Sequence, residues 1–216
     1  LSFDKKFVNG LLLLDLSAAF DTADQDKLLK ILHDEIGITG TAHQWFVSFL
    51  KGRTQKVMIN GVFSKLVSLD FGVPQGSVLG PILFNIYIRS IYSYVEALHF
   101  KIEGYADDHQ LYKQFVLIFQ ATVLGPSVNE CLSSISKWMN NYFLKLNKTK
   151  IKIMVLTPPS VMQSIFIHGT FIDNGCVRFV DCAKNLGEWI DSELTIKVQI
   201  HKVVSSCFLL LREIWK

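Results

Sequence analysis

A run of four leucines that ends in one aspartate constrains the fold of this chain more than any other feature. Residues 11–16 are apolar apart from Asp15, and turn-forming serine and aspartate residues follow soon afterwards. So short a run predicts a buried strand rather than a helix. Burying a carboxylate is costly unless a cation or hydrogen-bond donors compensate its charge. We therefore expect a core strand that presents Asp15 at its end, with a divalent metal ion as one candidate for the compensating charge.

A second acidic feature lies near the middle of the chain. Residues 99–105 and 109–115 alternate apolar and polar side chains, which predicts two strands joined by a tight turn at Ala106-Asp107-Asp108. Adjacent carboxylates repel each other and favour a hard cation with oxygen ligands. If this turn and Asp15 meet in one sheet, three carboxylates can hold two Mg²⁺ ions roughly 4 Å apart for phosphoryl or nucleotidyl transfer. Acidic pairs at surface turns are usually just solvated, so the spacing alone leaves that alternative open.

The remaining pattern predicts a domain of mixed helices and strands, of the α+β class. Asn60-Gly61 favours a two-residue type I′ turn, which predicts a hairpin between residues 54–59 and 62–69. A serine and a glutamate at Ser127 and Glu130 fit a capping box at a helix start. Hydrophobic spacing predicts helices over residues 24–35, 41–51, 80–96 and 127–141, and a strand over residues 151–156.

The double proline Pro158-Pro159 is the best candidate for a domain boundary. We expect residues 1–157 to form the main domain and residues 158–216 a small C-terminal extension. Within this extension the pattern predicts short strands and then a helix, near residues 164–172, 176–180, 186–190 and 195–215.

Composition excludes several classes of protein. Hydrophobic residues make up 50% of the 216 residues and charged residues 19%, which suits a packed core and argues against disorder. No apolar run reaches the ~18–20 residues of a membrane span, and Asp15 directly after the leucines argues against a signal peptide. The four cysteines show no zinc-type spacing, so we expect reduced thiols without disulfides, in an intracellular protein. A net charge of +3 suits nucleic-acid binding but is too mild to identify it.

Three motifs in one order resemble a known family. They are Leu14-Asp-Leu-Ser-Ala-Ala-Phe-Asp-Thr22, Gly72-Val-Pro-Gln-Gly-Ser-Val-Leu-Gly-Pro81 and Tyr105-Ala-Asp-Asp108. Two later blocks continue the pattern: Leu144-Lys-Leu-Asn147 with Lys150, and Lys184-Asn-Leu-Gly187 with Asp191-Ser-Glu-Leu194. Together they resemble the reverse transcriptase of non-LTR retrotransposons, the LINE-type elements. Each motif alone is modest evidence, but all five in order make coincidence an inadequate explanation.

The resemblance implies a fold, a reaction and a set of metal ligands. The fold would be a polymerase palm, an antiparallel sheet backed by helices, with residues 158–216 as the palm/thumb connection. The reaction would be RNA-directed DNA synthesis, a two-metal nucleotidyl transfer to a primer 3′ end. Asp15, Asp107 and Asp108 match the catalytic, metal-binding aspartates, and the backbone carbonyl of Leu16 would be a further ligand. The implied cofactor is two Mg²⁺ ions, with Mn²⁺ as a substitute.

The resemblance also implies partners and the residues that contact them. The partners would be an RNA template, a DNA primer and deoxynucleoside triphosphates, with the nucleus as the site of action. Phe20 matches an aromatic gate that excludes a 2′-hydroxyl, with an ordinary core phenylalanine as the alternative. Gln75 and Gly76 match a turn beside nucleotide and template, or form a plain helix-entry turn. Lys150 matches a lysine near the triphosphate, or is solvated, and Tyr105 would pack beneath the metal site.

The chain also departs from the family pattern. It lacks the usual residue at Gln25, His109, Ile151, Lys152, Glu188 and Gln199. Gln25 and Gln199 replace a frequent histidine, and Glu188 puts a charge where an apolar residue is usual. We interpret this scatter as a copy under little constraint. Ten residues precede the leucine run, so we expect the fingers region of the family to be largely missing and the thumb to be at most the last helix.

Three functions therefore compete. The first is an RNA-directed DNA polymerase palm, which we expect to extend primers poorly or not at all as this chain alone. The second is a degenerate, catalytically inactive retrotransposon fragment that binds nucleic acid or protein weakly. The third, an RNA-dependent RNA polymerase, is disfavoured by Phe20 and by alanine rather than glycine at Ala106.

Overall fold

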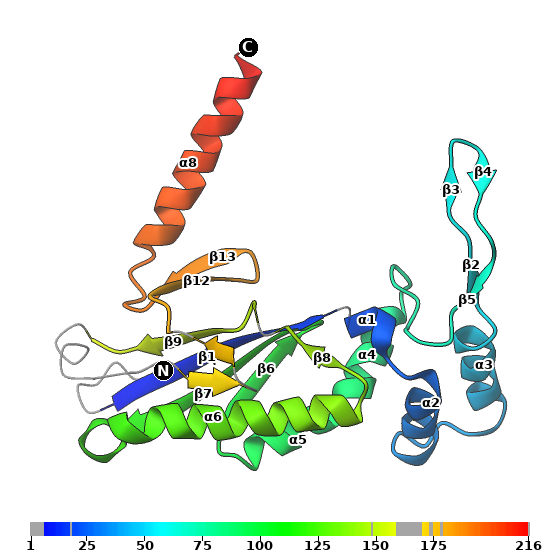
Figure 1. Ribbon diagram of the computed structural model, residues 1–216, viewed down its shortest axis with the longest axis horizontal. Helices are drawn as coiled ribbons and strands as arrows, with labels where there is room; N and C mark the ends of the chain where they lie inside the picture. The colour runs from blue at the N-terminus through cyan, green and yellow to red at the C-terminus, as the bar shows by residue number, and fades with distance from the viewer. Residues whose placement is uncertain are drawn as a thin grey trace. The chain divides into compact units, whose positions relative to one another are not determined.

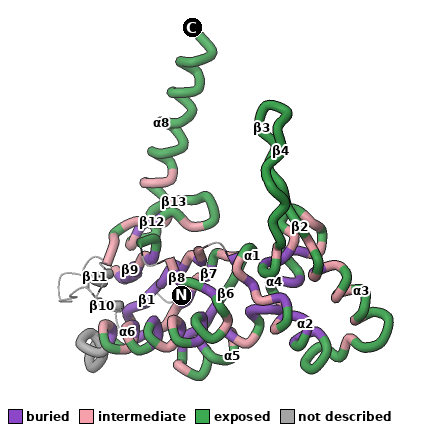
Figure 2. Tube along the Cα trace, turned by 45° about the vertical axis from the view of Figure 1, so that its right-hand side comes forward, coloured by how far each residue is buried: buried purple, intermediate pink, exposed green. Residues whose placement is uncertain are grey.

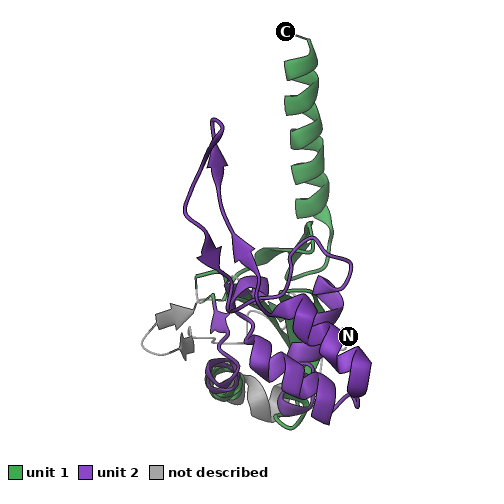
Figure 3. Cartoon of the chain, turned by 90° about the vertical axis from the view of Figure 1, so that its right-hand side faces the viewer, with its two compact units in different colours: residues 1–15, 95–134, 147–216 green, residues 16–94, 135–146 purple. Residues whose placement is uncertain are grey.

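The computed structural model describes residues 7–17, 19–147, 149–158, 170–172, 175–177 and 179–215, which form helices and antiparallel strands (Figure 1). Most residues of the central strand β1 (Phe7–Ser17) are buried, while helix α8 (Lys197–Ile214) has no buried residue and is exposed from Ile200 onward (Figure 2). The chain forms two compact units, shown in Figure 3. Unit 1 comprises Leu1–Asp15, Val95–Ser134 and Asn147–Lys216, and unit 2 comprises Leu16–Tyr94 and Ile135–Leu146.

Unit 1 is built on an antiparallel sheet around β1, the strand predicted from the leucine run. Its strand order is β6 (Lys101–Tyr105), β7 (Asp108–Val116), β1, β9 (Lys152–Leu156). Successive side chains on a strand point to opposite faces. Leu11 and Leu13 pack on one face with Ala183, while the Gly10 position faces Leu124 of helix α6 on the other. Because β1 is covered on both faces, its sequence is continuously apolar and does not alternate.

The hairpin of β6 and β7 has the predicted tight turn. Tyr105 pairs with Asp108, and Ala106 between them has a φ of 56°. The first strand starts two residues later than predicted, because His99 closes a turn at the end of helix α5 (Ser90–Glu96) with a φ of 59°.

Helix α6 (Leu117–Asn141) begins ten residues before its predicted start, so the capping-box prediction is wrong. Pro126 lies inside the helix rather than before it. The hydroxyl of Ser127 accepts a hydrogen bond from Nζ of Lys113 at 3.1 Å, so a tertiary contact engages the hydroxyl. Among the described residues no helix is both long and apolar enough to cross a membrane.

The C-terminal part of unit 1 contains two short hairpins and a helix. Its elements are β10 (Thr170–Ile172), β11 (Gly175–Val177), β12 (Cys182–Asn185), β13 (Glu188–Asp191) and α8. The helix was predicted almost to the residue. The strand predicted over residues 186–190 is wrong at its start, because Leu186 and Gly187 form the β12–β13 turn with positive φ angles. Residues 164–169 lie outside the described residues.

Buried Asp191 fixes the chain between β13 and α8. The carboxylate of Asp191 accepts hydrogen bonds from the backbone N–H groups of Thr195 and Glu193 and from the Thr195 hydroxyl. The bond from Thr195 N–H is the main cause that holds the pKa of Asp191 below its ordinary value. Glu188 is exposed at the start of β13, so its charge does not enter the core.

Unit 2 is mainly helical. Its helices are α1 (Ala19–Thr22), α2 (Gln25–Asp34), α3 (Gly40–Leu50), α4 (Gly80–Ile88) and most of α5. The predicted long helix over residues 80–96 is two helices, because i→i+3 hydrogen bonds on both sides of Arg89 replace the α-helical pattern. Pro81 stands in the first turn of α4, where a proline is tolerated.

The predicted hairpin of unit 2 is present in four short pieces. They are β2 (Thr54–Gln55), β3 (Met58–Ile59), β4 (Val62–Phe63) and β5 (Val67–Ser68). Asn60 and Gly61 have φ angles of 50° and 82°, as the type I′ turn requires. The last two residues of β1, Leu16 and Ser17, pair with β8 (Lys145–Leu146) in this unit.

Tyr87 connects the elements of unit 2. Its buried hydroxyl donates to the carbonyl oxygen of Tyr142 at 2.6 Å and accepts from the backbone N–H of Asp24 at 3.2 Å. Desolvation by burial raises the pKa of Tyr87 to about 12, so the hydroxyl remains a donor. Asp24 in turn caps α2, because its side chain accepts from the N–H of Lys27 at 2.7 Å.

Three cysteines of the chain are free thiols in the structure. Cys131 is buried, Cys182 is half-buried and Cys207 is exposed. Burial raises the pKa of the Cys131 thiol to about 12, which makes it unreactive. The surroundings of the Cys176 side chain lie outside what the structure describes.

Candidate functional site

The register of the unit 1 sheet brings two of the predicted aspartates together. Asp15 of β1 stands directly opposite Asp108 of β7. Directly opposed residues of antiparallel strands have Cα atoms about 4.5–5.5 Å apart and side chains on the same face of the sheet. Asp107 precedes Asp108 in the β6–β7 turn. The spacing argument foresaw this arrangement, because both acids lie at strand ends.

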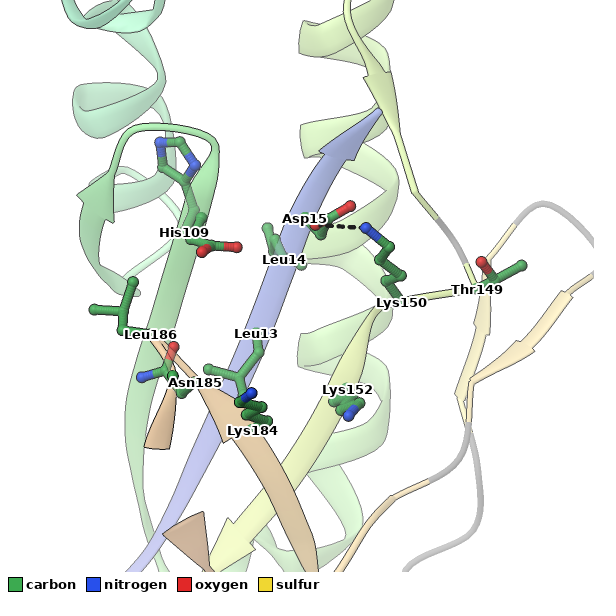
Figure 4. Close-up of a pocket in the computed structure, with 12 residues that line it drawn as sticks. Leu13, Leu14, Asp15, His109, Thr149, Lys150, Lys152, Lys184, Asn185 and Leu186 are labelled. Atoms are coloured by element: carbon green, nitrogen blue, oxygen red, sulfur yellow. Dashed lines mark hydrogen bonds and ion pairs between the residues drawn. The ribbon is translucent and has the colours of Figure 1, made fainter. Parts of the chain in front are cut away.

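Lys150 stands on the other side of Asp15. The β1–β9 pairing joins Leu13 to Lys152, and extending that register by two residues puts Lys150 opposite Asp15. Its Nζ atom lies 3.1 Å from Oδ2 of Asp15, and the Lys150 side chain is 63% exposed. Figure 4 shows the ammonium group pointing at the carboxylate. Asp15 therefore lies between a second acid and a cation, and Lys150 supplies part of the compensation that its burial requires.

The carboxylates of this site influence one another. The pKa of Asp108 is raised above its ordinary value, first by desolvation, then by the charges of Asp107 and Asp15. His109 and Lys150 act in the opposite direction but do not cancel this effect. A cation bound between the acids would relieve their repulsion.

His109 supports the acidic turn from the opposite face of the sheet. Its side chain is buried, and its Nδ1 lies 3.3 Å from the carbonyl oxygen of Asp107, to which an Nδ1–H donates. Desolvation lowers the pKa of His109, so the ring is neutral at neutral pH. This departure from the family pattern thus has a structural role under the turn.

A pocket of about 330 Å³ opens beside the acids. Its lining combines Asp15 and Asp108 with three lysines: Lys150, Lys152 and Lys184. The β12–β13 turn lines it too, at Gly187 and at Leu186; Leu186 is labelled in Figure 4. The pocket can therefore hold an anionic group on its basic side next to a cation on its acidic side.

The β12–β13 turn also lines a depression beside the acidic turn. This depression has a volume of about 560 Å³ and includes Tyr105, Asp107, Asp108 and the Leu186-Gly187 turn. Tyr105 is 73% exposed, so the prediction that it packs beneath the site is wrong. Tyr105 is the last residue of β6, where it pairs with Asp108, and its ring points away from the core.

Several lining residues were not predicted as part of the site. Lys152 reaches the pocket because it pairs with Leu13 from the neighbouring strand β9. Lys184 and the Leu186-Gly187 turn reach it because the β12–β13 hairpin lies on the same sheet face as Asp15. A hydrogen bond of 3.1 Å from Asn185 Nδ2 to Gln110 Oε1 holds that hairpin against β7. The signal that could have found them was the glycine after Leu186, which favours a turn over a strand.

The carboxylates of this site are the candidate ligands for the implied metal ions. Among the described residues no group of three or more His, Cys, Asp or Glu side chains is arranged to hold a metal ion. Asp15 and Asp108 nevertheless fit a hard cation in their chemistry, since both offer carboxylate oxygens and face one another. Leu16, the other implied ligand, belongs to unit 2, where its backbone pairs with Leu146.

The implied nucleotide-contacting residues Phe20, Gln75 and Gly76 lie in unit 2. Phe20 is half-buried and its ring centroid lies 4.7 Å from that of Phe84, so it also packs against the core. Gln75 and Gly76 are exposed, and Gly76 has a φ of 79°. The N–H of Val73 donates to the carbonyl oxygen of Phe20 at 2.8 Å, which ties the two segments together.

Gln25 fixes the segment that precedes Gln75. Its buried Nε2 donates to the carbonyl oxygens of Leu69 at 3.2 Å and Gly72 at 3.1 Å. Gly72 has a φ of 82°, and a Cβ there would lie 2.9 Å from the backbone oxygens of Phe20 and Asp21. At Gln25 the departure from the family pattern is therefore compensated by specific hydrogen bonds.

Comparison with known proteins shows the family to which the chain belongs. The family model "Reverse transcriptase (RNA-dependent DNA polymerase)" matches residues 3–193. The chain is 27% identical over 161 residues to the RNA-directed DNA polymerase from mobile element jockey of Drosophila melanogaster, covering 72% of the chain and 17% of that protein. It is 24% identical over 218 residues to the probable RNA-directed DNA polymerase from transposon BS of the same species, covering 95% and 22%. The chain thus spans about a fifth of the length of these relatives.

Solved structures show the same fold. A telomerase from Candida tropicalis, truncated from its C-terminal domain, superposes with a TM-score of 0.57 at 15% identity, covering 88% of the chain and 35% of the telomerase. A telomerase from Candida albicans, solved with a fragment of telomeric RNA, superposes with a TM-score of 0.58 at 14% identity, covering 87% and 31%. The α+β polymerase palm expected from the sequence is confirmed.

Proposed function

Because the chain belongs to the reverse transcriptase (RNA-dependent DNA polymerase) family, we propose that it carries the palm site of an RNA-directed DNA polymerase. The reaction would add deoxynucleotides to the 3′ end of a DNA primer along an RNA template. One observation carries the proposal: a strand register that sets Asp15 directly opposite Asp108, with Asp107 beside it.

In this proposal Asp15, Asp107 and Asp108 hold two Mg²⁺ ions, with the carbonyl oxygen of Leu16 as a further ligand. Divalent ions in such a site stabilise the attacking and leaving oxygens of a nucleotidyl transfer. The raised pKa of Asp108 supports the assignment, because part of its cause is the repulsion that a bound cation would remove.

The basic side of the pocket suits the triphosphate of an incoming nucleotide. Lys150, Lys152 and Lys184 line it next to the acids, and ammonium groups bind phosphate as point charges. Lys150 would leave Asp15 when a divalent ion takes over the neutralisation of that carboxylate. Its exposed side chain leaves it free to turn toward the phosphates. The Leu186-Gly187 turn, which lines the pocket and the depression beside it, would support the primer end.

The residues of unit 2 would select the nucleotide. Phe20 would exclude a 2′-hydroxyl by its bulk, and Gln75 with Gly76 would contact nucleotide and template. The tie from Val73 N–H to the Phe20 carbonyl oxygen supports a shared role, since it couples the two segments.

A second candidate function is a catalytically inactive fragment that retains weak binding to nucleic acid or protein. It is favoured by one observation, the lack of a closed metal-holding group among the described residues. The two candidate functions differ in whether nucleotide incorporation depends on the aspartates of the site.

Primer extension on poly(A)/oligo(dT) with Mg²⁺ tests the proposal. The chain is compared with its Asp107→Asn, Asp108→Asn double variant, and an Asp70→Asn variant serves as the control because Asp70 is exposed outside the site. We expect low but measurable incorporation by the chain and the control, and a loss to background in the double variant. Equal incorporation by all three proteins would remove the catalytic proposal in favour of the inactive fragment.

A further inference from the structure

The turn between β8 and β9 is tied to Asp15 through the main chain. The backbone N–H of Asn147 donates to the carbonyl oxygen of Asp15 at 3.0 Å. The carbonyl oxygen of Asn147 accepts from the N–H groups of Lys150 at 3.0 Å and Ile151 at 3.2 Å. These bonds use only backbone atoms, so they fix the position of residue 147 whatever its side chain is.

The Asn147 side chain makes a second connection, to the carboxylate itself. Its Nδ2 lies 3.1 Å from Oδ1 of Asp15, and the hydroxyl of Thr149 donates to its Oδ1 at 2.8 Å. A carboxylate can only accept, so the amide must present its NH₂ group to Asp15. The Thr149 hydroxyl occupies the amide oxygen and holds that orientation.

The two oxygens of Asp15 thus have different partners. Oδ1 receives a neutral amide donor from Asn147, whereas Oδ2 receives the ammonium group of Lys150. A divalent cation would displace an ammonium ion by like-charge repulsion, but it leaves a neutral amide in place. The terminal torsion of an aspartate is broad, so without the amide bond the carboxylate is free to rotate.

We infer that Asn147, oriented by Thr149, is a positioning residue that fixes the rotation of the Asp15 carboxylate for a divalent cation. The inference rests on the proposed function, in which Asp15 is a metal ligand. Hydrogen-bonding partners of metal ligands typically contribute about 10–100-fold in metal affinity, because they hold the ligand in its binding orientation. In this proposal Asn147 and Thr149 would act on the Asp15 carboxylate and would not themselves be metal ligands.

Mn²⁺ binding tests the inference without requiring polymerase activity. Free Mn²⁺ is measured by its electron paramagnetic resonance signal during titration of the full chain. We expect the Kd of the Asn147→Ala variant to rise about 10-fold or more. Thr149→Val, which removes only the orienting hydroxyl, should weaken binding severalfold, and Thr149→Ser, which keeps the hydroxyl, should restore it.

Two controls separate this role from a structural one. Asn140→Ala removes an exposed asparagine outside the site and should leave the Kd unchanged. Urea unfolding of each variant shows whether the chain still folds. If Asn147→Ala does not fold, the comparison of Thr149→Val with Thr149→Ser provides the test. A role limited to stability would lower the unfolding midpoint and leave the Kd of the folded protein as it was.

The outcomes distinguish the inference from the function on which it rests. An unchanged Mn²⁺ Kd in folded Asn147→Ala, or in Thr149→Val when that pair carries the test, would overturn the positioning role and leave the proposed metal site intact. Equal Mn²⁺ binding by the natural chain and the Asp107→Asn, Asp108→Asn variant, or no binding by either, would overturn both.

Discussion

At Asp108 the stability of the fold and the proposed function make opposite demands on the carboxylate. Desolvation raises its pKa, and so do the neighbouring charges of Asp107 and Asp15. The folded chain therefore disfavours the ionised form that a metal site needs. A site of this kind is less stable before its cation binds, and the energy of cation binding offsets that cost.

This opposition predicts a pH dependence of stability. Because the pKa of Asp108 is higher in the folded chain than in the unfolded one, its contribution is favourable below about pH 3.9, the ordinary aspartate value, and is lost as the pH rises through the folded pKa. Asp108→Asn should therefore stabilise the metal-free chain at neutral pH, by no more than about 0.5 kcal/mol after discounting for solvent screening.

Urea unfolding at about pH 7 and about pH 3 measures this difference. The increase in the free energy of unfolding from Asp108→Asn should be present at the higher pH and absent at the lower pH. The control, Asp70→Asn, should have no effect at either pH. A variant less stable than the natural chain at neutral pH would show that the Asp108 charge is not repelled.

Gln25 gives a second prediction at the residue scale. Gln25→Ala leaves the carbonyl oxygens of Leu69 and Gly72 without their buried donor, which should lower the free energy of unfolding by about 1–3 kcal/mol. Gln25→His restores the residue usual in the family and, with one N–H in the neutral ring, should lie between the two. Gln44→Ala, at an exposed position of α3, is the control. Equal stability of Gln25→Ala and the natural chain would show that these bonds contribute nothing.

The site residues that lie at strand ends could be predicted from the sequence. The residues that act through tertiary contacts could not. Asp15 and Asp108 follow from one rule, that acids ending paired strands meet. Gln25 and Asn147 act through the carbonyl and carboxyl groups of residues far away in the chain. Their amides carry no local pattern that would separate them from solvated ones.

At the scale of elements, prediction succeeded where local periodicity determines the structure. The leucine strand, the Asn60-Gly61 turn and helix α8 form as their patterns require. It was wrong where tertiary contacts override local signals. Ser127 has the composition of a cap, but its hydroxyl pairs with Lys113 inside a longer helix.

The turn that leads from the unit 2 hairpin to Gln75 depends on a glycine at position 72. Gly72 and Gly61 share a φ of 82°, but only at Gly72 would a Cβ meet backbone atoms, at 2.9 Å. Gly61→Ala should cost about 1–2 kcal/mol for the left-handed conformation. Gly72→Ala should cost clearly more, because the backbone of Phe20 and Asp21 must also move.

Urea unfolding of the two variants compares them directly. If Gly72→Ala is no more destabilising than Gly61→Ala, the close approach of the Gly72 segment to Phe20 is not required for folding.

At the scale of the whole molecule, family and fold are clear, and the proposed metal-binding acids lie at one end of two paired strands of the unit 1 sheet. The chain shares the reverse transcriptase family model over residues 3–193 and the telomerase fold at 14–15% identity. The register that opposes Asp15 to Asp108 lies within the residues that this family model matches. Gln25 and His109, two of the departures from the family pattern, both make hydrogen bonds to backbone carbonyl oxygens in the folded chain.

Anomalous X-ray diffraction from crystals of the chain soaked in Mn²⁺ tests the central claim, that the opposed carboxylates of Asp15 and Asp108 share a divalent cation. The account predicts an anomalous peak about 2.0–2.3 Å from a carboxylate oxygen of each residue, with Lys150 withdrawn from Asp15. A fully soaked crystal with no peak there, or with the two carboxylates turned to opposite faces of the sheet, would contradict it.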